Sequence, residues 1–230
     1  MGHIAVTLAR SGSKEVRDKN ILNIKNIAVS HFPMLAAANS SGINHLIYSS
    51  DSTRYLELAQ KFYDQQNFKH LKLELHLRSS KNSSDRAGSW DAIKEIVEDQ
   101  NLASRTKHVV LLAATCPTIN STDIDLFLEN IDLTKSAISV REIDYPVENT
   151  FINSNGFFKK HALTSFLGAR QEMSKVFRPD GHIYFRPLSD LNTKFPNNET
   201  QLVNLNKEFY SNIDTKSDFN IAKFTLESRF

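Results

Sequence analysis

Short apolar runs alternate with amphipathic segments along the first 140 residues of the chain. Apolar or alternating runs, typical of buried strands, occur at residues 3–8, 44–49, 72–77, 108–114 and 136–141. Segments with apolar residues at helical spacing stand between them, at 29–41, 53–66, 89–100 and 122–130. This alternation predicts an α/β fold, a Rossmann-like and mostly parallel sheet with helices on both faces. The run HVVLLAA (108–114) is the most apolar, which predicts a central strand.

Two helix ends are also marked. Gly42 follows the first helical segment and suits a C-terminal cap, because glycine adopts a left-handed conformation at no steric cost. Ser121 or Thr122 stands before a later helical segment and suits an N-terminal cap. These residues predict where the two helices stop and start.

The alternation ends near residue 142. Two β-like pieces flank SNG at 154–156, which is a hairpin signal, and a polar stretch follows. Further on, 182–186 and 200–205 predict strands, and 214–228 predicts a C-terminal helix. We interpret the chain as a single domain, 1–230, with an inserted lobe at about 142–200.

Composition limits the class of protein. The chain has 28 basic and 26 acidic residues, a formal net charge of +2, which argues against a protein that coats nucleic acid. A single cysteine, Cys116, excludes an internal disulfide framework and fits a reducing cytoplasm. No apolar run reaches the length of about 18 residues that spans a bilayer, and the N-terminus lacks a secretory pattern. We therefore expect a cytoplasmic protein that binds neither nucleic acid nor membrane.

The loop after the first predicted strand concentrates candidate binding residues. It reads ARSGSKEVRDKN (9–20) and carries four cations, Arg10, Lys14, Arg17 and Lys19. Ligands of parallel α/β sheets bind beyond the carboxyl ends of the strands. Between the cations, backbone N–H groups can approach phosphate closely at three small residues, Ser11, Gly12 and Ser13. The spacing matches neither GxxxxGK[ST] nor GxGxxG, so from the residues alone a phosphate cradle and a solvated loop are equally open.

A co-linear series of motifs resembles the N-acylneuraminate cytidylyltransferases, the CMP-sugar synthetases. ARSGSKEVRDKN resembles their ARxGSKxxxxKN signature. The later matching segments are SSDS (49–52), LHLRSS (75–80), SSDRAGSWDAI (83–93), LLAATCPT (111–118), ARQEMSKVFRPDGHIYF (169–185) and SNIDTKSDFNIA (211–222). They span almost the whole chain. The resemblance implies a nucleotide-diphospho-sugar transferase-like fold, and an enzyme that transfers CMP from CTP to the anomeric hydroxyl of sialic acid or a related nonulosonate, releasing pyrophosphate.

The resemblance also assigns roles. The catalytic residues would be Arg10, Lys14, Lys19 and Asp214. The three cations among them would stabilise the departing pyrophosphate. The nucleotide would be bound by Arg10, Ser11, Gly12, Ser13, Asn20, Arg78 and Ser89, and the acidic sugar by Arg170, Gln171 and Arg178. Asp214 and Asn212 would hold the Mg²⁺ cofactor. The inserted lobe implies a homodimer.

Four positions depart from the family pattern: Ala113 for glutamine, Glu148 for lysine, Asp180 for asparagine and Asn212 for aspartate. A carboxylate at Asp180 would repel an acidic sugar unless it is paired. The departures favour an acceptor other than plain N-acetylneuraminate. Two other hypotheses stay open: a degenerate nucleotide-binding module without turnover, and an enzyme that uses another nucleotide such as GTP.

Several of these residues also have purely structural interpretations. Arg178 could pair with Asp180 or Glu172 at the surface. His182 begins a strand, which favours packing over catalysis, and Trp90 is typical of a core residue.

Overall fold

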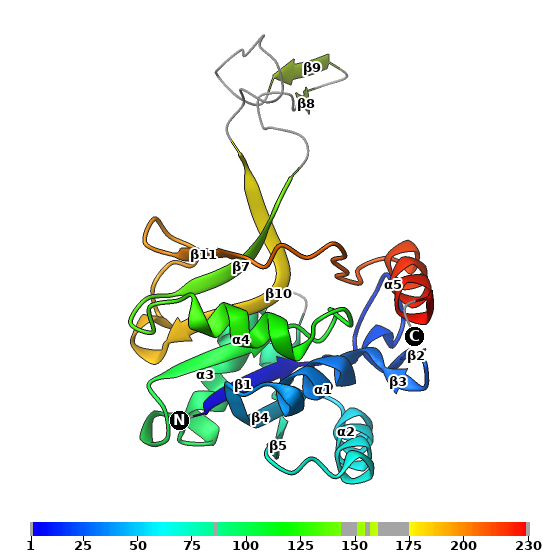
Figure 1. The fold of residues 1–230 in the computed structure, drawn as a ribbon, viewed down its shortest axis with the longest axis vertical. Coiled ribbons are helices and arrows are strands. Elements are labelled where there is room, and N and C mark those ends of the chain that lie inside the picture. The colour runs from blue at the N-terminus through cyan, green and yellow to red at the C-terminus, as the bar shows by residue number, and fades with distance from the viewer. Residues whose placement is uncertain (1, 85–86, 144–150, 155–156, 161–174, 229–230) are drawn as a thin grey trace.

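In the computed structural model, the chain forms a seven-stranded sheet with helices on both faces (Figure 1). The structure describes all residues except 1, 85–86, 144–150, 155–156, 161–174 and 229–230. The strand order is β11-β7-β10-β6-β1-β4-β5. The strands are β1 (His3–Leu8), β4 (Ile43–Ser50), β5 (Lys72–Leu77), β6 (His108–Leu112), β7 (Ala137–Glu142), β10 (Phe177–Pro187) and β11 (Gln201–Asn204). The most apolar run, β6, lies in the middle of this order, which confirms its predicted central place.

The sheet is mostly parallel, as predicted. β1 pairs parallel with β4 and β6, β4 with β5, and β7 with β11. β10 is the exception, because it runs antiparallel to both β6 and β7. It therefore enters the sheet against the direction of its two neighbours.

The helices cover the sheet in two layers. They are α1 (Phe32–Asn39), α2 (Thr53–Gln66), α3 (Ser89–Asp99), α4 (Ser121–Glu129) and α5 (Lys216–Ser228). Residues of α1, α2 and α4 share one apolar cluster with Ala5 of β1, and residues of α3 share another with Ile4 and Val6. Neighbouring residues of a strand thus face opposite layers. Burial on both faces explains why the strands read as continuous apolar runs.

The C-terminal helix α5 makes a smaller apolar cluster of its own. Ala222 of α5 packs with Ile213 and with Ile24 of β2 (Asn23–Ile24), beside β3 (Ile27–Ala28). The predicted start at 214 was two residues early, since α5 begins at Lys216. This packing places the segment before α5 next to the loop that follows β1.

The predicted cap at Gly42 is wrong. The first helix ends at Asn39, and Ser40, in an extended conformation, is its C-terminal cap. The Gly42 amide donates instead to Ser40 Oγ and to Asp125 Oδ1. The glycine therefore serves the turn into β4 rather than the helix end.

The predicted N-terminal cap of α4 is also displaced by one or two residues. Asn120 is the cap, in place of Ser121 or Thr122. Asn120 Oδ1 accepts from the Asp123 amide, and Asp123 Oδ2 accepts from the Asn120 amide. This reciprocal pair satisfies two backbone donors at once.

Beyond the body, the end of β7 and the start of β10 stand out from the sheet as a two-stranded arm (Figure 1). Past it, β8 (Phe151–Ser154) pairs antiparallel with β9 (Phe157–Lys160), which confirms the predicted hairpin. The lobe boundaries at 142–200 stay a prediction, because much of that segment lies outside the described residues. Within it, β10 extends to Pro187 and belongs to the main sheet. No helix in the described part of the chain is long and apolar enough to cross a membrane.

Candidate active site

A cleft of about 1000 Å³ opens at the carboxyl ends of the parallel strands. The loop after β1, the start of α3, the segment after β6, part of β10 and the segment before α5 line it. The cleft brings together nine of the predicted site residues: Arg10, Ser13, Lys14, Lys19, Asn20, Arg78, Ser89, Asn212 and Asp214. These residues are separated by up to 204 positions in sequence, from Arg10 to Asp214, and only the topology of the sheet places them on one surface.

Lys19 links the cationic loop to the segment before α5. Its Nζ donates to the Ile213 carbonyl at 2.8 Å and to Asp214 Oδ1 at 3.0 Å. The Lys19 side chain is only 17% exposed, whereas that of Asp214 is 69% exposed. The predicted cation and the predicted metal ligand therefore form an ion pair at the mouth of the cleft.

Asn20 closes the loop on itself. The residue is buried, and its Nδ2 donates to the Arg10 carbonyl at 2.9 Å. Its Oδ1 makes no hydrogen bond to any described residue. Asn20 thus fixes the backbone that carries Arg10, and its predicted contact with the nucleotide stays a prediction.

Ser11 and Gly12 belong to the same loop but are not among the residues that line the cleft. The Ser11 amide and hydroxyl both donate to the Asp51 carboxylate, at 2.8 and 3.1 Å. This contact ties the loop to the end of β4. A Cβ built on Gly12 would meet no heavy atom within 4 Å, so packing within the protein does not require glycine there. Their predicted phosphate contacts remain predictions.

Arg78 presents an unusual buried cation. The residue follows β5, its amide donates to the Ser50 carbonyl at 2.8 Å, and it is 7% exposed. Its Nε and Nη2 make no hydrogen bond to any described residue. Burial lowers the pKa of Arg78, although a guanidinium stays charged at neutral pH. A buried charge with open donors is costly unless an anion binds it, and this favours a ligand phosphate or carboxylate beside Arg78.

The N-terminus of α3 faces the same space. Gly88 is the cap, and its amide donates to Asp91 Oδ2 at 3.1 Å. Ser89 begins the helix and lines the cleft. The first turn of a helix carries a partial positive charge and free amides, which favour an anionic group at this position.

Sequence reasoning missed an aromatic wall on the cleft. Trp90, Tyr184 and Phe195 line it together. Trp90 meets Phe195 edge-on with ring centroids 5.3 Å apart, and the buried Arg186 guanidinium lies 4.9 Å from the Trp90 ring and 4.8 Å from that of Phe195. The core role expected for Trp90 is therefore only part of its role. No local pattern marks these rings, because they come from three separate segments.

Asn212 and Asp214 differ in what they offer to a cation. Thr115 Oγ1 donates to Asn212 Oδ1 at 2.7 Å, which uses one of the two lone pairs of this neutral amide oxygen. Asp214 presents an exposed carboxylate. Mg²⁺ is commonly bound by one or two carboxylates together with substrate phosphates. Asp214 fits that donor set, and Asn212 adds little to it.

Of the predicted sugar-binding residues, the structure describes Arg178, which does not line the cleft. Arg170 and Gln171, like the departure at Glu148, lie outside the described residues. Arg178 is exposed on the arm, opposite Arg141 in the strand register. The Asp180 side chain is fully buried and is bound by Ser139 and His182, so a surface pair between Arg178 and Asp180 is wrong, and the alternative partner Glu172 lies outside the described residues.

The fold and cleft define a nucleotide-binding α/β protein with cations at the carboxyl end of its first strand. The chain belongs to the cytidylyltransferase family, whose model matches residues 4–177, and it is a nucleotidyltransferase.

The chain is similar in sequence to characterised classes of sugar cytidylyltransferase. The chain is 27% identical over 197 residues to pseudaminic acid cytidylyltransferase of Campylobacter jejuni, covering 80% of this chain and 78% of that protein. It is 26% identical over 238 residues to N-acylneuraminate cytidylyltransferase of Streptococcus agalactiae, covering 95% of this chain and 52% of that protein.

Solved structures support the fold. A CMP:2-keto-3-deoxy-manno-octonic acid synthetase complexed with CTP superposes with a TM-score of 0.68 at 15% identity, covering 100% of both chains. A 4-diphosphocytidyl-2C-methyl-D-erythritol synthase gives a TM-score of 0.68 at 10% identity, covering 98% of each chain. Both confirm the nucleotide-diphospho-sugar transferase-like fold.

Proposed function

We propose that this protein transfers CMP from CTP to the anomeric hydroxyl of a nonulosonic acid and releases pyrophosphate. The observation that carries the proposal is the cleft that joins the cationic loop, the buried Arg78 and the exposed Asp214 carboxylate. Membership of the cytidylyltransferase family supports CTP as the donor. The similarity to pseudaminic acid and N-acylneuraminate cytidylyltransferases supports an acidic nine-carbon acceptor.

In the proposed reaction, the anomeric oxygen attacks the α-phosphorus of CTP. An O–P bond forms as the hydroxyl gives up its proton to solvent, the bond from the α-phosphorus to the bridging oxygen breaks, and pyrophosphate leaves with additional negative charge. Cations stabilise that charge as it grows. Arg10, Lys14 and Arg78 supply positive groups along the cleft, and Lys19 holds Asp214 near them.

We also propose Mg²⁺ as the cofactor, held by the Asp214 carboxylate together with oxygens of the triphosphate. Bound there, Mg²⁺ would supply charge neutralisation to the phosphates. Asp214 would be the charged protein ligand, since Asn212 offers only a neutral amide oxygen that already accepts from Thr115. Chelation with EDTA should abolish turnover, and added Mg²⁺ should restore it.

The acceptor we propose is a nonulosonate other than plain N-acetylneuraminate. The support is Ala113, which lines the cleft where the related enzymes carry a glutamine, and the similarity to pseudaminic acid cytidylyltransferases. Asp180 no longer supports this proposal. Its carboxylate is paired and turned into the protein, so it does not present a charge to the sugar.

We propose further that the protein acts as a homodimer in the cytoplasm. The two-stranded arm stands away from the body and carries Arg178 on its exposed surface (Figure 1). An arm of this kind suits contact with a second copy. Light scattering coupled to gel filtration should give twice the chain mass, and a monomer at micromolar concentration would contradict the dimer.

The decisive assay measures pyrophosphate release from CTP with a panel of nonulosonic acids. Pseudaminic, legionaminic and N-acetylneuraminic acids form the core of the panel. Highest kcat/KM with N-acetylneuraminate would refute the altered acceptor. If CTP binds but no acceptor gives pyrophosphate, the degenerate binding module becomes the better description.

Arg10→Ala should lower kcat by about 100-fold or more if Arg10 stabilises the leaving group.

A further inference from the structure

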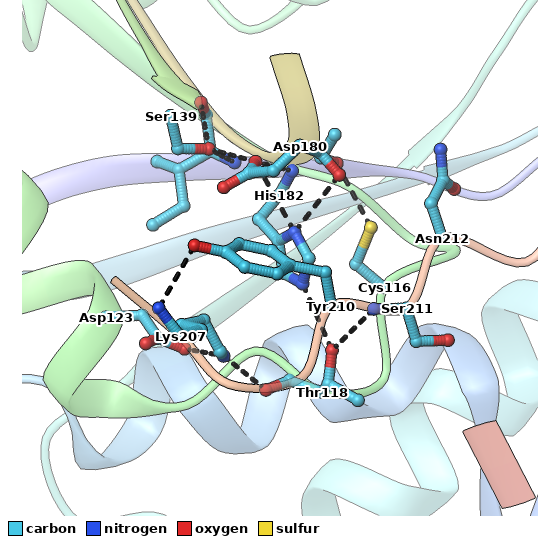
Figure 2. A network of polar contacts seen from close by, with 12 residues as sticks. Cys116, Thr118, Asp123, Ser139, Asp180, His182, Lys207, Tyr210, Ser211 and Asn212 are labelled. Carbon is cyan, nitrogen blue, oxygen red and sulfur yellow. Dashed lines mark hydrogen bonds and ion pairs between the residues drawn. The ribbon is translucent and has the colours of Figure 1, made fainter. Parts of the chain in front are cut away.

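A network of polar side chains lies beneath the Asn212 end of the cleft (Figure 2). It joins five parts of the chain: the segment after β6, α4, β7, β10 and the segment before α5. The labelled members are Cys116, Thr118, Asp123, Ser139, Asp180, His182, Lys207, Tyr210, Ser211 and Asn212. The proposed reaction gives none of these residues a step, so the role of the network needs its own explanation.

Asp180 anchors one end of the network. Its Oδ1 accepts from Ser139 Oγ at 2.5 Å and from the His182 amide at 2.8 Å. Burial alone would raise the pKa of Asp180, but the contacts with His182 and Ser139 outweigh it and lower the pKa below its ordinary value. Asp180 is therefore an ionised carboxylate inside the protein, and it acts only as an acceptor.

His182 carries the connection from Asp180 to the next segment. Its ring is fully buried, with Nδ1 3.4 Å from Asp180 Oδ1 and Nε2 3.1 Å from Thr118 Oγ1. Because Asp180 only accepts, Nδ1 bears a proton, and Nε2 shares a hydrogen bond with the Thr118 hydroxyl. Tyr210 meets the ring edge-on at 5.5 Å and fixes its plane. His182 is thus more than the packing residue that the sequence favours.

Thr118 joins this pair to the segment before α5. Its Oγ1 accepts from the Ser211 amide at 3.1 Å, and its carbonyl accepts from Lys207 Nζ at 2.6 Å. Lys207 also pairs with Asp123. One hydroxyl therefore bonds the His182 ring of β10 and accepts from the backbone just before Asn212.

The segment held in this way carries the cleft residues Asn212 and Asp214. It belongs to neither a strand nor a helix, so no ladder of backbone hydrogen bonds fixes it. Its described contacts to the rest of the protein include those with Thr118, the Ile213 amide to the Thr115 carbonyl at 2.9 Å, and the Lys19 pair. Thr115 and Lys19 line the cleft and Thr118 does not, and Thr118 touches no residue of the cationic loop in the described contacts.

We propose that Thr118 is a positioning residue for Asp214 and Asn212. Its hydroxyl fixes the Ser211 amide against the Asp180–His182 pair, and this sets where the Asp214 carboxylate stands relative to the phosphates. The proposal rests on the proposed function, because it assumes that Asp214 binds Mg²⁺ with the triphosphate. Thr118 does not line the cleft. It is the last residue of the matching segment LLAATCPT (111–118), but the family resemblance assigns it no role.

A matched pair of variants isolates the hydroxyl. Thr118→Val keeps the shape of the side chain and removes both hydrogen bonds, and Thr118→Ser keeps the hydroxyl. Hydrogen exchange read by mass spectrometry should show faster exchange for peptides covering 211–214 in Thr118→Val than in wild type. Thr118→Ser should exchange at the wild-type rate. Equal protection of 211–214 in all three proteins would overturn the proposal.

The second readout is metal affinity without turnover. Mn²⁺ binding in the presence of CTP, followed by electron paramagnetic resonance, should weaken by about 5- to 10-fold in Thr118→Val, the size expected for a lost hydrogen bond. Thr118→Ser should stay close to wild type. Unchanged Mn²⁺ affinity in Thr118→Val, with normal binding in wild type, would also overturn the proposal.

A core variant separates positioning from general loss of stability. Ile96→Val truncates a fully buried residue of α3 on the other face of the sheet. It should lower the melting temperature yet leave exchange at 211–214 and Mn²⁺ affinity unchanged. If Thr118→Val does not fold, Thr118→Ala removes the same hydroxyl without placing a methyl group against His182, and the same readouts apply.

The outcomes distinguish this proposal from the proposed function. If the wild type binds no Mn²⁺ with CTP and releases no pyrophosphate with any acceptor, the proposed function fails, and the positioning of a metal ligand fails with it. If the wild type is active and binds Mn²⁺ while Thr118→Val matches it in exchange and affinity, only the role of Thr118 fails.

Discussion

At the scale of single residues, two positions have features that packing within the protein does not explain. Gly12 has space for a side chain, and Arg78 is buried with open donors. Neither feature improves the fold by itself. Both are explained by a ligand that approaches the backbone at Gly12 and an anion that reaches Arg78, and each explanation can be tested without changing the other.

Gly12→Ala should separate ligand contact from folding. Its added methyl group meets no heavy atom within 4 Å, and replacing glycine at an unstrained position commonly stabilises a protein by about 0.4–1 kcal/mol. We expect an equal or slightly higher melting temperature and an increase in KM for CTP of about 5-fold or more, since the methyl group would oppose close approach of a phosphate. An unchanged KM would place the phosphates away from Gly12.

Arg78→Met should weaken CTP binding with little effect on stability. The attraction of Arg78 to Asp51 and Glu95 is lost, but so is the cost of burying a guanidinium with unsatisfied donors. We expect the free energy of unfolding in urea to change by less than about 1 kcal/mol, whereas KM for CTP rises by about 10-fold or more.

Arg78→Lys provides the matched control for this variant. It keeps the charge and loses the planar fork, so it should fall between wild type and Arg78→Met in KM. A large loss of stability in Arg78→Met with a normal KM would show that the residue is structural.

At the scale of elements, the sequence predicted the strands and helices of the body well, because both faces of the sheet are buried and the apolar pattern is strong. The helix predicted at 53–66 matches α2 at both ends. The errors fell at Gly42 and at the cap of α4, where side-chain contacts with Asp125 and Asp123 decided the local conformation. The sequence alone does not show which of these side-chain contacts forms.

The contact of His31 with α2 predicts a dependence of stability on pH. His31 precedes α1, is buried, and stacks on Phe62 with ring centroids 4.7 Å apart. Burial lowers the pKa of His31 from 6.5 to about 4. Below pH 6.5 the unfolded chain therefore takes up a proton more readily than the folded one. The stability is complete above pH 6.5 and falls as the pH drops towards 4, by up to about 3 kcal/mol.

Urea denaturation at pH 7, 5 and 4 measures this effect. His31→Phe keeps a ring against Phe62 and should lose less stability between pH 7 and pH 4 than wild type. His70→Gln, at an exposed position, should retain the wild-type dependence. Identical pH dependence in His31→Phe and wild type would show that His31 does not carry the effect.

At the scale of the whole molecule, the cleft is an assembly of segments from both ends of the chain. Lys19 from the first loop meets Asp214 from the segment before α5. A nucleotide in the cleft would contact both, so binding should stabilise the body as a unit.

Thermal shift with the four nucleoside triphosphates tests this expectation. CTP with Mg²⁺ should raise the melting temperature most. At a concentration of 100 times Kd, a ligand that binds only the folded state adds about 2.7 kcal/mol of stability. A larger shift with GTP would overturn CTP as the donor, and equal shifts with all four would show that the base is not read.

The sequence by itself determined the order of the elements, the mostly parallel sheet and the place of the cationic loop, since each follows from local periodicity and from the rule that ligands bind at strand ends. It also supplied most residues of the cleft through motifs with fixed spacing. The tertiary structure decided the rest. It turned Asp180 away from the ligand and into a pair with His182, assigned the oxygen of Asn212 to Thr115, and brought Trp90, Tyr184 and Phe195 to one wall. These outcomes depend on contacts between segments far apart in the chain, and burial there sets whether a charge faces a ligand or a partner, which no local pattern records.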